Sequence, residues 1–448
     1  MGQRKALDCS VERLTNGPKH HLFGFHDLII SNKADTKYLC LEVDIINRPP
    51  LAGELFGVGY VENGKFVRVG ETTALNYPQG ARQQWVAESD LFTVNNRVGD
   101  VWGTDLYDAS NNKLLDRFEA TTHMLSKDGH YAFGLDYARL FRLGGYGYSG
   151  IPDISANEIA PSNSGITVLD LKTKEKKILV SVREAAECGH TKLLSGSSHY
   201  LTHLCLNPSC TRLAFLHRYS LPDGGGMTRL MTIGVDGTGL RCIAQGFLSH
   251  FDWKDDNHVY IFGRANSSLD SFRDNKLLSN PIVSSSLVFA KKVIKSLLGK
   301  KANNLGKSFM MISDSETPAI IPFAQDIIPL DGHPMTNPSN NNWCVSDTYP
   351  DVNGDRVLML YDFEKSIRYD LGNFRMIFET PDMSLREDFF KGVDLQKIVS
   401  PDNLAFTRSG LHCDLHPRWN SKGDKVVFDS IHEGTRQMYR INIKDIIQ

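Results

Sequence analysis

Short runs of alternating apolar and polar residues recur along the whole chain. Each run has a polar residue, usually histidine, then a few apolar residues, a turn of Ser, Asn, Pro, Lys, Asp or Gly type, and an apolar strand. Turn residues between two apolar or β-branched runs predict a β-hairpin. The clearest copies lie at 123–137, 203–219, 250–263 and 416–430, and weaker copies lie at 26–43, 84–96 and 333–348.

A third strand follows several of these hairpins, for example at 166–171, 231–237 and 437–443, and a fourth is indicated at 176–181. Repeated units of about four short strands, with almost no helical periodicity, are typical of a β-propeller. We therefore predict an all-β, seven-bladed β-propeller that occupies residues 1–448 as a single domain. A two-domain sandwich is the competing fold, but it does not explain repetition along the whole chain.

The units are spaced by roughly 60 residues, which is longer than the ~40–50 of common propeller repeats. Two insertions, 137–164 and 265–307, hold most of the excess, and we expect both as long loops on one face. The second contains a short basic amphipathic helix near 286–301, with lysines beside an apolar stripe. Such a helix can make weak contact with an anionic membrane surface, although its apolar stripe more often packs on its own domain.

Histidine recurs at one position of the repeat. In a propeller this position is the start of the innermost strand, at the mouth of the central channel. Imidazole is the commonest transition-metal ligand and is well matched to proton transfer near neutral pH. The alternative role is a framework hydrogen bond within each blade. Alignment of the seven units on their turns brings together His26, Gln84, His123, His203, His250, His333 and His416.

Charge and cysteine content exclude several classes of function. Fifty basic residues against 52 acidic ones give a net charge of -2, so the chain lacks the basic field of a nucleic-acid-binding protein. None of the eight cysteines forms a Cys-x-x-Cys motif, which argues against a zinc knuckle or a thioredoxin-like site. No apolar segment follows the N-terminal charges, so we expect a cytoplasmic protein with reduced thiols. A secreted chain with its signal trimmed is the alternative.

Three segments carry a resemblance to a known family. They read YLTHLCLNPSCTRLAFLHRY at 200–219, HFDW at 250–253 and LHCDLHPRWNSKG at 411–423, and VERLT at 11–15 adds to them. They resemble the oligogalacturonate lyases, seven-bladed propeller enzymes that cleave short pectic uronate chains by β-elimination. The resemblance implies that His203 is the catalytic base and that His250 and His416 bind a divalent metal.

The last segment departs from the family pattern, in which a Gln and two His bind the metal. Leu411 stands at the Gln position and Asp414 at the first His position, whereas His416 matches the second. Two histidines and a carboxylate still suit a divalent metal, and His333 or His412 could join them. The implied cofactor is Mn²⁺, with Zn²⁺ or Ca²⁺ as alternatives.

β-Elimination from a uronate requires three groups. A cation or arginine neutralises the carboxylate, a base removes the adjacent ring proton, and an acid assists the leaving oxygen. We assign the base to His203, the carboxylate partners to Arg218 and Arg229, and stacking or proton donation to Tyr137. Arg436 is a further arginine candidate. Each arginine and tyrosine has the alternative role of stabilising a loop.

The sequence therefore predicts a metal-dependent lyase that acts on an acidic, uronate-containing oligosaccharide or polysaccharide. A second hypothesis is a non-catalytic propeller that binds a glycan or a protein. A third is a hydrolase in which His203 activates water. Unsaturated products would distinguish the lyase from both.

Overall fold

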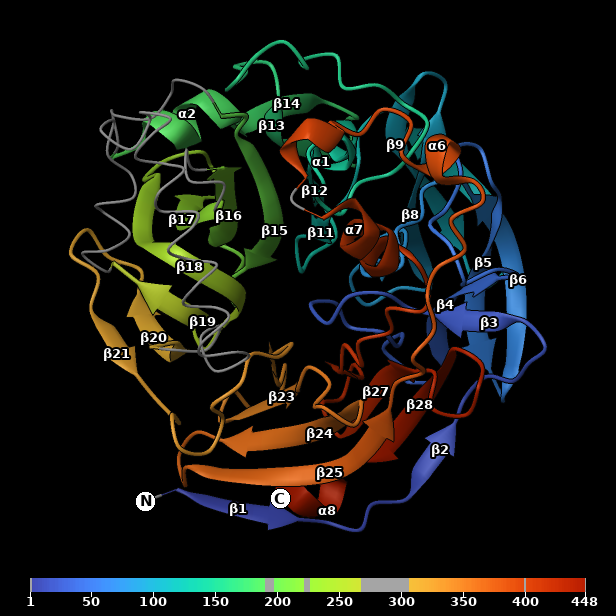
Figure 1. The fold of residues 1–448 in the computed structure, drawn as a ribbon, viewed down its shortest axis with the longest axis vertical. Coiled ribbons are helices and arrows are strands. Elements are labelled where there is room, and N and C mark those ends of the chain that lie inside the picture. The colour runs from blue at the N-terminus through green and yellow to red at the C-terminus, as the bar shows by residue number, and fades with distance from the viewer. Residues whose placement is uncertain (1, 190–196, 221–225, 267–305, 399, 448) are drawn as a thin grey trace. The chain divides into compact units, whose positions relative to one another are not determined.

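A computed structural model describes residues 2–189, 197–220, 226–266, 306–398 and 400–447 (Figure 1). Strands dominate these residues, and their helices are short. Among them, no helix is long and apolar enough to span a membrane. The predicted basic helix at 286–301 and most of the 265–307 insertion lie outside the described residues.

The strands of the described residues form six sheets. Three of these sheets come from the first part of the chain, and each has four strands in the order of the sequence. The first contains β3 (His20–Leu22), β4 (Lys37–Val43), β5 (Phe56–Glu62) and β6 (Lys65–Thr72). The second contains β7 (Gln84–Trp85), β8 (Leu91–Val98), β9 (Val101–Asp108) and β10 (Lys113–Phe118). The third contains β11 (Met124–Leu125), β12 (Tyr131–Gly134), β13 (Gly165–Asp170) and β14 (Lys176–Ser181).

A seven-stranded sheet follows, because one long strand pairs on both sides. Its strands are β15 (Tyr200–Leu206), β16 (Arg212–Ser220), β17 (Gly226–Gly234), β18 (Arg241–Trp253), β19 (His258–Ala265), β20 (Ser308–Ser313) and β21 (Ile320–Pro322). The first half of β18 pairs with β17, and the pairing with β19 shifts register between Leu248 and Phe251. The long strand thus links two groups of four.

The last two sheets both recruit the N-terminal segment. The strand β1 (Gln3–Ala6) runs parallel to β25 (Ile367–Arg375), beside β24 (Asp355–Asp362), β23 (Trp343–Asp347) and β22 (Met335–Thr336). The strand β2 (Val11–Arg13) is antiparallel to β28 (Gln437–Asn442), beside β27 (Lys425–Ser430) and β26 (Arg418–Trp419). The two ends of the chain are therefore joined through one sheet (Figure 1).

Six short helical elements connect or follow the sheets of the described residues. They are α1 (Tyr137–Arg142), α2 (Val182–Glu187), α6 (Arg386–Phe389), the 3-10 turn η2 (Leu395–Lys397), α7 (Pro401–Arg408) and α8 (Lys444–Ile447). The segment 382–408 was not anticipated from the sequence, because helices of four and eight residues leave little periodicity. Arg408 joins it to the α1 region by donating to the carbonyls of Phe141 and Gly145 at 2.8 and 3.1 Å.

Tryptophan links two segments of different repeats in the same way at three places. The indole N–H of Trp85 donates to the carbonyl of Ile30 at 3.0 Å. The indoles of Trp253 and Trp419 donate to the carbonyls of Cys205 and Met335, each at 2.9 Å. These tryptophans are buried, so each packs its ring in the core while its N–H is satisfied by a carbonyl.

The chain separates into two compact units. Unit 1 is Met1–Ile154, Thr167–Lys177 and Gly332–Gln448, and unit 2 is Ser155–Ile166 and Ile178–Asp331. Within unit 1, a core cluster that includes Trp343, Trp419 and Phe428 packs the last two sheets together. The expectation of a chain built mainly of strands is confirmed. The single domain over residues 1–448 stays a prediction.

Candidate metal centre

Three buried side chains of unit 1 converge at the start of two sheets. His333 precedes β22, and Asp414 and His416 precede β26. One ligand atom from each lies within 4.8 Å of the others. The sequence predicted Asp414 and His416 as metal ligands and His333 as a residue that could join them, and the fold brings these three side chains together. Two imidazoles and a carboxylate form a donor set that suits divalent Mn²⁺, Fe²⁺ or Zn²⁺.

Hydrogen bonds orient both imidazoles. Nδ1 of His333 lies 2.7 Å from Oδ1 of Asp347, and Nδ1 of His416 lies 2.9 Å from the carbonyl of Gly24. Because a carbonyl can only accept, His416 carries its proton on Nδ1 and presents the lone pair of Nε2. Partners of this kind are typical of metal-binding histidines. The residues present therefore fit a metal ion.

Asp347, at the end of β23, holds the backbone of both histidines as well. Its Oδ1 accepts from the peptide N–H of His333 at 2.9 Å, and its Oδ2 accepts from that of His416 at 3.2 Å. The carboxylate is fully buried. This residue was not among the predicted ligands or their partners. Its only signal was a carboxylate that ends the apolar strand WCVSD.

His416 adopts a backbone φ of +42°, in the left-handed region that non-glycine residues seldom occupy. Such a conformation costs about 1–3 kcal/mol and is found preferentially at functional sites. The pKa of His416 is held well below 6.5, first by burial and then by the nearby His333 and His26. A neutral imidazole is the form that binds metal.

The carboxylate of Asp414 is surrounded by nitrogen atoms. Its Oδ2 lies 3.2 Å from Nε2 of His412 and 3.9 Å from Nε2 of His333, and its Oδ1 lies 3.5 Å from Arg356. Burial lowers the pKa of His412, and the charge of Asp414 opposes this shift. His412, which the sequence left as a possible additional ligand, thus contacts the cluster through Asp414.

Two further histidines of the predicted ring lie in unit 1. The His26 ring centroid is 5.5 Å from that of His333 and 6.1 Å from that of His416. His123 belongs to a separate network, in which its Nε2 lies 3.8 Å from Asp27 and its Nδ1 lies 2.8 Å from the hydroxyl of Tyr137. Gln84, the non-histidine member, donates to the carbonyl of His123 at 3.3 Å and accepts from the N–H of Leu125 at 2.9 Å.

Tyr137 was expected in an open loop but lies buried at the start of α1. It stacks on Tyr148 at 4.3 Å between ring centroids, and burial holds its pKa well above 10. The loop forms a helix here because Asp136 caps it, accepting from the N–H of Arg139 at 2.9 Å. The hydroxyl therefore faces His123 in the protein interior.

The proposed base, His203, lies in unit 2 on β15, where the pairing with β16 shifts register. Its φ is +56°, so it shares the left-handed conformation of His416. Its Nδ1 lies 2.9 Å from the hydroxyl of Thr202. The catalytic role stays a prediction.

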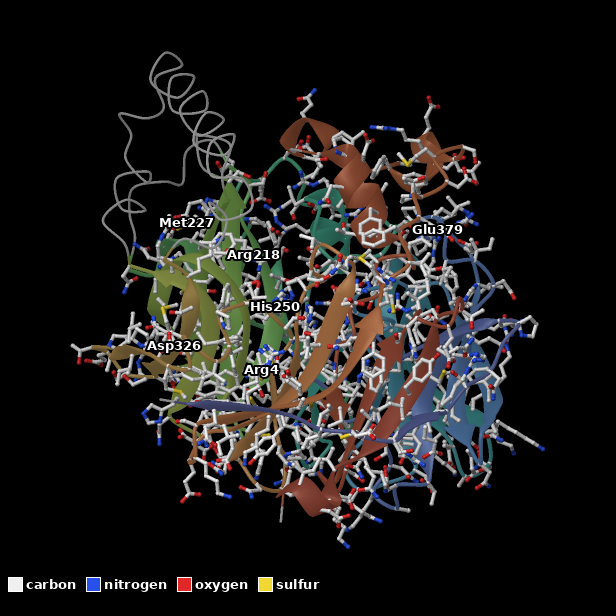
Figure 2. The ribbon with its side chains drawn as sticks, turned by 60° about the horizontal axis from the view of Figure 1, so that its bottom comes forward. Arg4, Arg218, Met227, His250, Asp326 and Glu379 are labelled. Atoms are coloured by element: carbon white, nitrogen blue, oxygen red, sulfur yellow. The ribbon has the colours of Figure 1, made fainter. Side chains whose placement is uncertain are left out.

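His250 lies in unit 2 at the register shift of β18. Its Nδ1 is 3.1 Å from both Oδ1 of Asp331 and the hydroxyl of Ser249. Figure 2 shows His250 and Arg218 among the strands of this unit. A carboxylate partner on Nδ1 is the arrangement seen at His333 in unit 1, and it is compatible with the predicted role in metal binding.

The two arginines predicted to bind the substrate carboxylate have different surroundings. Arg229 is fully buried and donates to the carbonyls of Ala185, at 2.9 Å, and Cys188, near the end of α2. Arg218 is half-buried, and its Nε has no hydrogen-bond partner among the described residues. Nε of Arg229 likewise has no partner among these residues, so the two arginines differ in exposure and not in a free nitrogen. Arg436, a further candidate, is buried and donates to backbone carbonyls and to Asp429.

Comparison with known proteins identifies the fold. No protein-family model and no curated protein matches the sequence. A solved oligogalacturonate lyase from Vibrio parahaemolyticus aligns with a TM-score of 0.56 and 11% identity, over 98% of this chain and 95% of that one. An oligogalacturonate lyase in complex with manganese aligns with a TM-score of 0.55 and 12% identity, over the same shares. The chain thus has a β-propeller fold like that of the oligogalacturonate lyases.

Proposed function

We propose that this protein is a metal-dependent lyase that cleaves a uronate-containing oligosaccharide or polysaccharide by β-elimination. The observation that carries the proposal is the buried cluster of His333, Asp414 and His416, with Nδ1 of both histidines engaged in a hydrogen bond. This cluster occurs on a fold similar to that of the oligogalacturonate lyases. We propose Mn²⁺ as the metal, with Zn²⁺ or Ca²⁺ as alternatives, and a cytoplasmic location.

The proposal includes seven blades. The described sheets support this count if β18 is counted twice, as the outer strand of one blade and the inner strand of the next. Six of the seven groups then have four strands, the last of them completed by β2, and the group that contains β22 to β25 has β1 as a fifth strand. Closure of a propeller by an N-terminal strand leaves only short, protected sheet edges.

The roles of the side chains follow from their chemistry. His333, Asp414 and His416 would hold the metal, which when bound supplies positive charge beside the uronate carboxylate and so stabilises the developing enolate. For unit 2 we propose the roles that the sequence gives to each residue by itself: Arg218 as a partner of a substrate carboxylate, His203 as a base and His250 as a metal ligand. The roles of His203 and His250 rest on the sequence resemblance.

Two measurements on the purified protein test the function. The first is its content of Mn²⁺, Zn²⁺ and Ca²⁺ before and after chelation. The second is ultraviolet absorbance during incubation with a panel of acidic oligosaccharides, because β-elimination creates a conjugated double bond. Carboxyl-reduced forms of the same sugars are the matched control, since they lack the group that makes the proton acidic. Absorbance that appears only with the acidic sugars and the metal-loaded protein supports the lyase.

A non-catalytic glycan- or protein-binding propeller is the second candidate. It is favoured by one observation, that Tyr137 and Arg229 are fully buried in contacts within the protein. This candidate predicts saturable binding of an acidic glycan without cleavage. Cleavage to saturated products would instead indicate the hydrolase that the sequence also allowed.

A further inference from the structure

Unit 1 contains a cavity of about 620 Å³ that none of the three candidate metal ligands lines. Its walls come from the first strands of several sheets and from the turns that follow them, at 27–33, 84–88, 124–127 and 421–422, together with Met335. Small-molecule sites occupy about 300–1,000 Å³. The cavity thus has the size of a site for a small ligand.

The cavity combines a buried apolar wall with an exposed basic margin. Trp85, Met124 and Met335 are each less than a tenth exposed and form much of the wall. The indole of Trp85 is fixed, because its N–H donates to the carbonyl of Ile30. Methionine side chains adapt to irregular ligands, and a fixed aromatic ring offers a flat apolar face.

The basic margin comes from three turns. Lys33, Lys127 and Lys422 are exposed and line the cavity. Lys33 is paired with Glu88, whereas Lys127 and Lys422 have no ion pair among the described residues. Single lysines in turns are ordinary solvated residues. Here three of them, from turns far apart in the sequence, border one apolar cavity.

The acidic residues that line the cavity do not neutralise Lys127 and Lys422, because they are paired with other basic residues. Glu88 is neutralised by Lys33, and Asp27 forms a two-point ion pair with the buried Arg82, at 2.8 and 3.1 Å. Lys127 and Lys422 therefore give the margin an uncompensated positive charge. A ligand that matches this surface needs a negative group and an apolar body.

We propose that this cavity binds a small organic anion, namely a carboxylate or phosphate on a carbon skeleton with an apolar face. The anionic group would lie against Lys127 and Lys422, and the skeleton against Trp85 and the two methionines. This site goes beyond the proposed lyase function, because it neither uses nor requires the metal cluster.

Isothermal titration calorimetry tests the site with four probes: glucuronate, glucose 6-phosphate, glucose and inorganic phosphate. We expect binding of at least one of the two anionic sugars, and no binding of glucose. Combined Lys127→Gln and Lys422→Gln should weaken that binding about tenfold or more, because two exposed charge pairs are lost. The matched control is combined Lys65→Gln and Lys391→Gln, which removes the same charge from exposed positions outside the cavity.

His416→Ala separates this site from the metal cluster, since anion binding should persist when the metal site is impaired. Hydrogen exchange should show protection at the turns 126–128 and 421–423 upon binding. The proposal is overturned if neither anionic sugar binds to the unmodified protein. It is also overturned if the variant with Lys127→Gln and Lys422→Gln binds the sugar as well as the control variant with Lys65→Gln and Lys391→Gln does. Equal binding of inorganic phosphate would also overturn it, because the apolar wall would then contribute nothing.

Discussion

Oδ1 of Asp347 lies 2.7 Å from Nδ1 of His333, and the same carboxylate also holds the peptide N–H groups of His333 and His416. One buried acid thus positions two candidate metal ligands that are 83 residues apart in the sequence (416 minus 333). Because the ligand atoms are held before any ion arrives, little ordering entropy is lost on binding.

The first prediction is that Asp347→Asn weakens divalent metal binding while retaining all three ligands. The carboxylate accepts from three N–H groups, whereas an amide directs its NH₂ group at one of them. Loss of such a partner typically costs about 10–100-fold in metal affinity. Calorimetric titration with Mn²⁺ measures the change. Asp388→Asn, at an exposed carboxylate of α6, is the control and should bind as the unmodified protein does.

The second prediction concerns the ligand itself. A metal at 100 times its dissociation constant stabilises a protein by about 2.7 kcal/mol, so added Mn²⁺ should raise the melting temperature. His416→Ala should abolish most of this rise. His258→Ala removes an exposed histidine and should preserve it. If the unmodified protein gains no stability from any divalent ion, the metal site is wrong.

The third prediction tests His203 as the base. Its φ of +56° makes asparagine the better replacement, because asparagine tolerates the left-handed region more readily than alanine does. As a general base, His203 should contribute about 10²–10⁴-fold, so His203→Asn should lower kcat by that factor with little change in melting temperature.

A framework role for His203 gives the opposite pattern. Stability would then fall by about 1–3 kcal/mol, and activity only as far as unfolding explains. The pH profile adds a second readout, since loss of the base should remove the acid limb of kcat/KM. His258→Asn, in the same unit, controls for the loss of an imidazole. A fully active His203→Asn protein would eliminate the proposed mechanism.

The fourth prediction is a pH dependence of stability in unit 2. Burial raises the pKa of Asp314, but hydrogen bonds from Arg212 and Thr232 and the charges of Arg212 and Arg241 outweigh it and lower the pKa below 3.8. Arg212 donates to this carboxylate at 2.7 and 3.2 Å. The ionised carboxylate of Asp314 therefore stabilises the folded state. This contribution is complete above pH 3.8 and is lost as the pH falls through the lower pKa of the folded protein.

Asp314→Asn should therefore destabilise the protein at neutral pH and make its stability less sensitive to acid below pH 4. Urea unfolding at a series of pH values measures both effects. Asp256→Asn, at a carboxylate without an ion pair among the described residues, should change neither. The prediction is contradicted if the free energy of unfolding of Asp314→Asn falls with acid below pH 4 as steeply as that of the unmodified protein.

The repeats could be predicted because their signals are local. Alternation of apolar residues sets the strands, turn residues such as Asn207 and Gly129 set the hairpins, and both act over a few positions. The same repetition showed that His333 and His416 occupy the same position of their repeats, and the fold brings these residues together. The seven-stranded sheet was harder to foresee, because β18 continues through a register shift without a turn.

What the sequence by itself determined is thus the class of fold and the position of the histidines within each repeat. Only the tertiary structure decided their partners, since Asp347 and the carbonyl of Gly24 approach His416 from 69 and 392 positions away. It also buried Tyr137 and Arg229, which as isolated sequence positions resembled exposed substrate-binding groups. The physical reason is that strand and turn preferences act between neighbours in the chain, whereas burial and hydrogen-bond partners are set by whichever distant segments pack alongside.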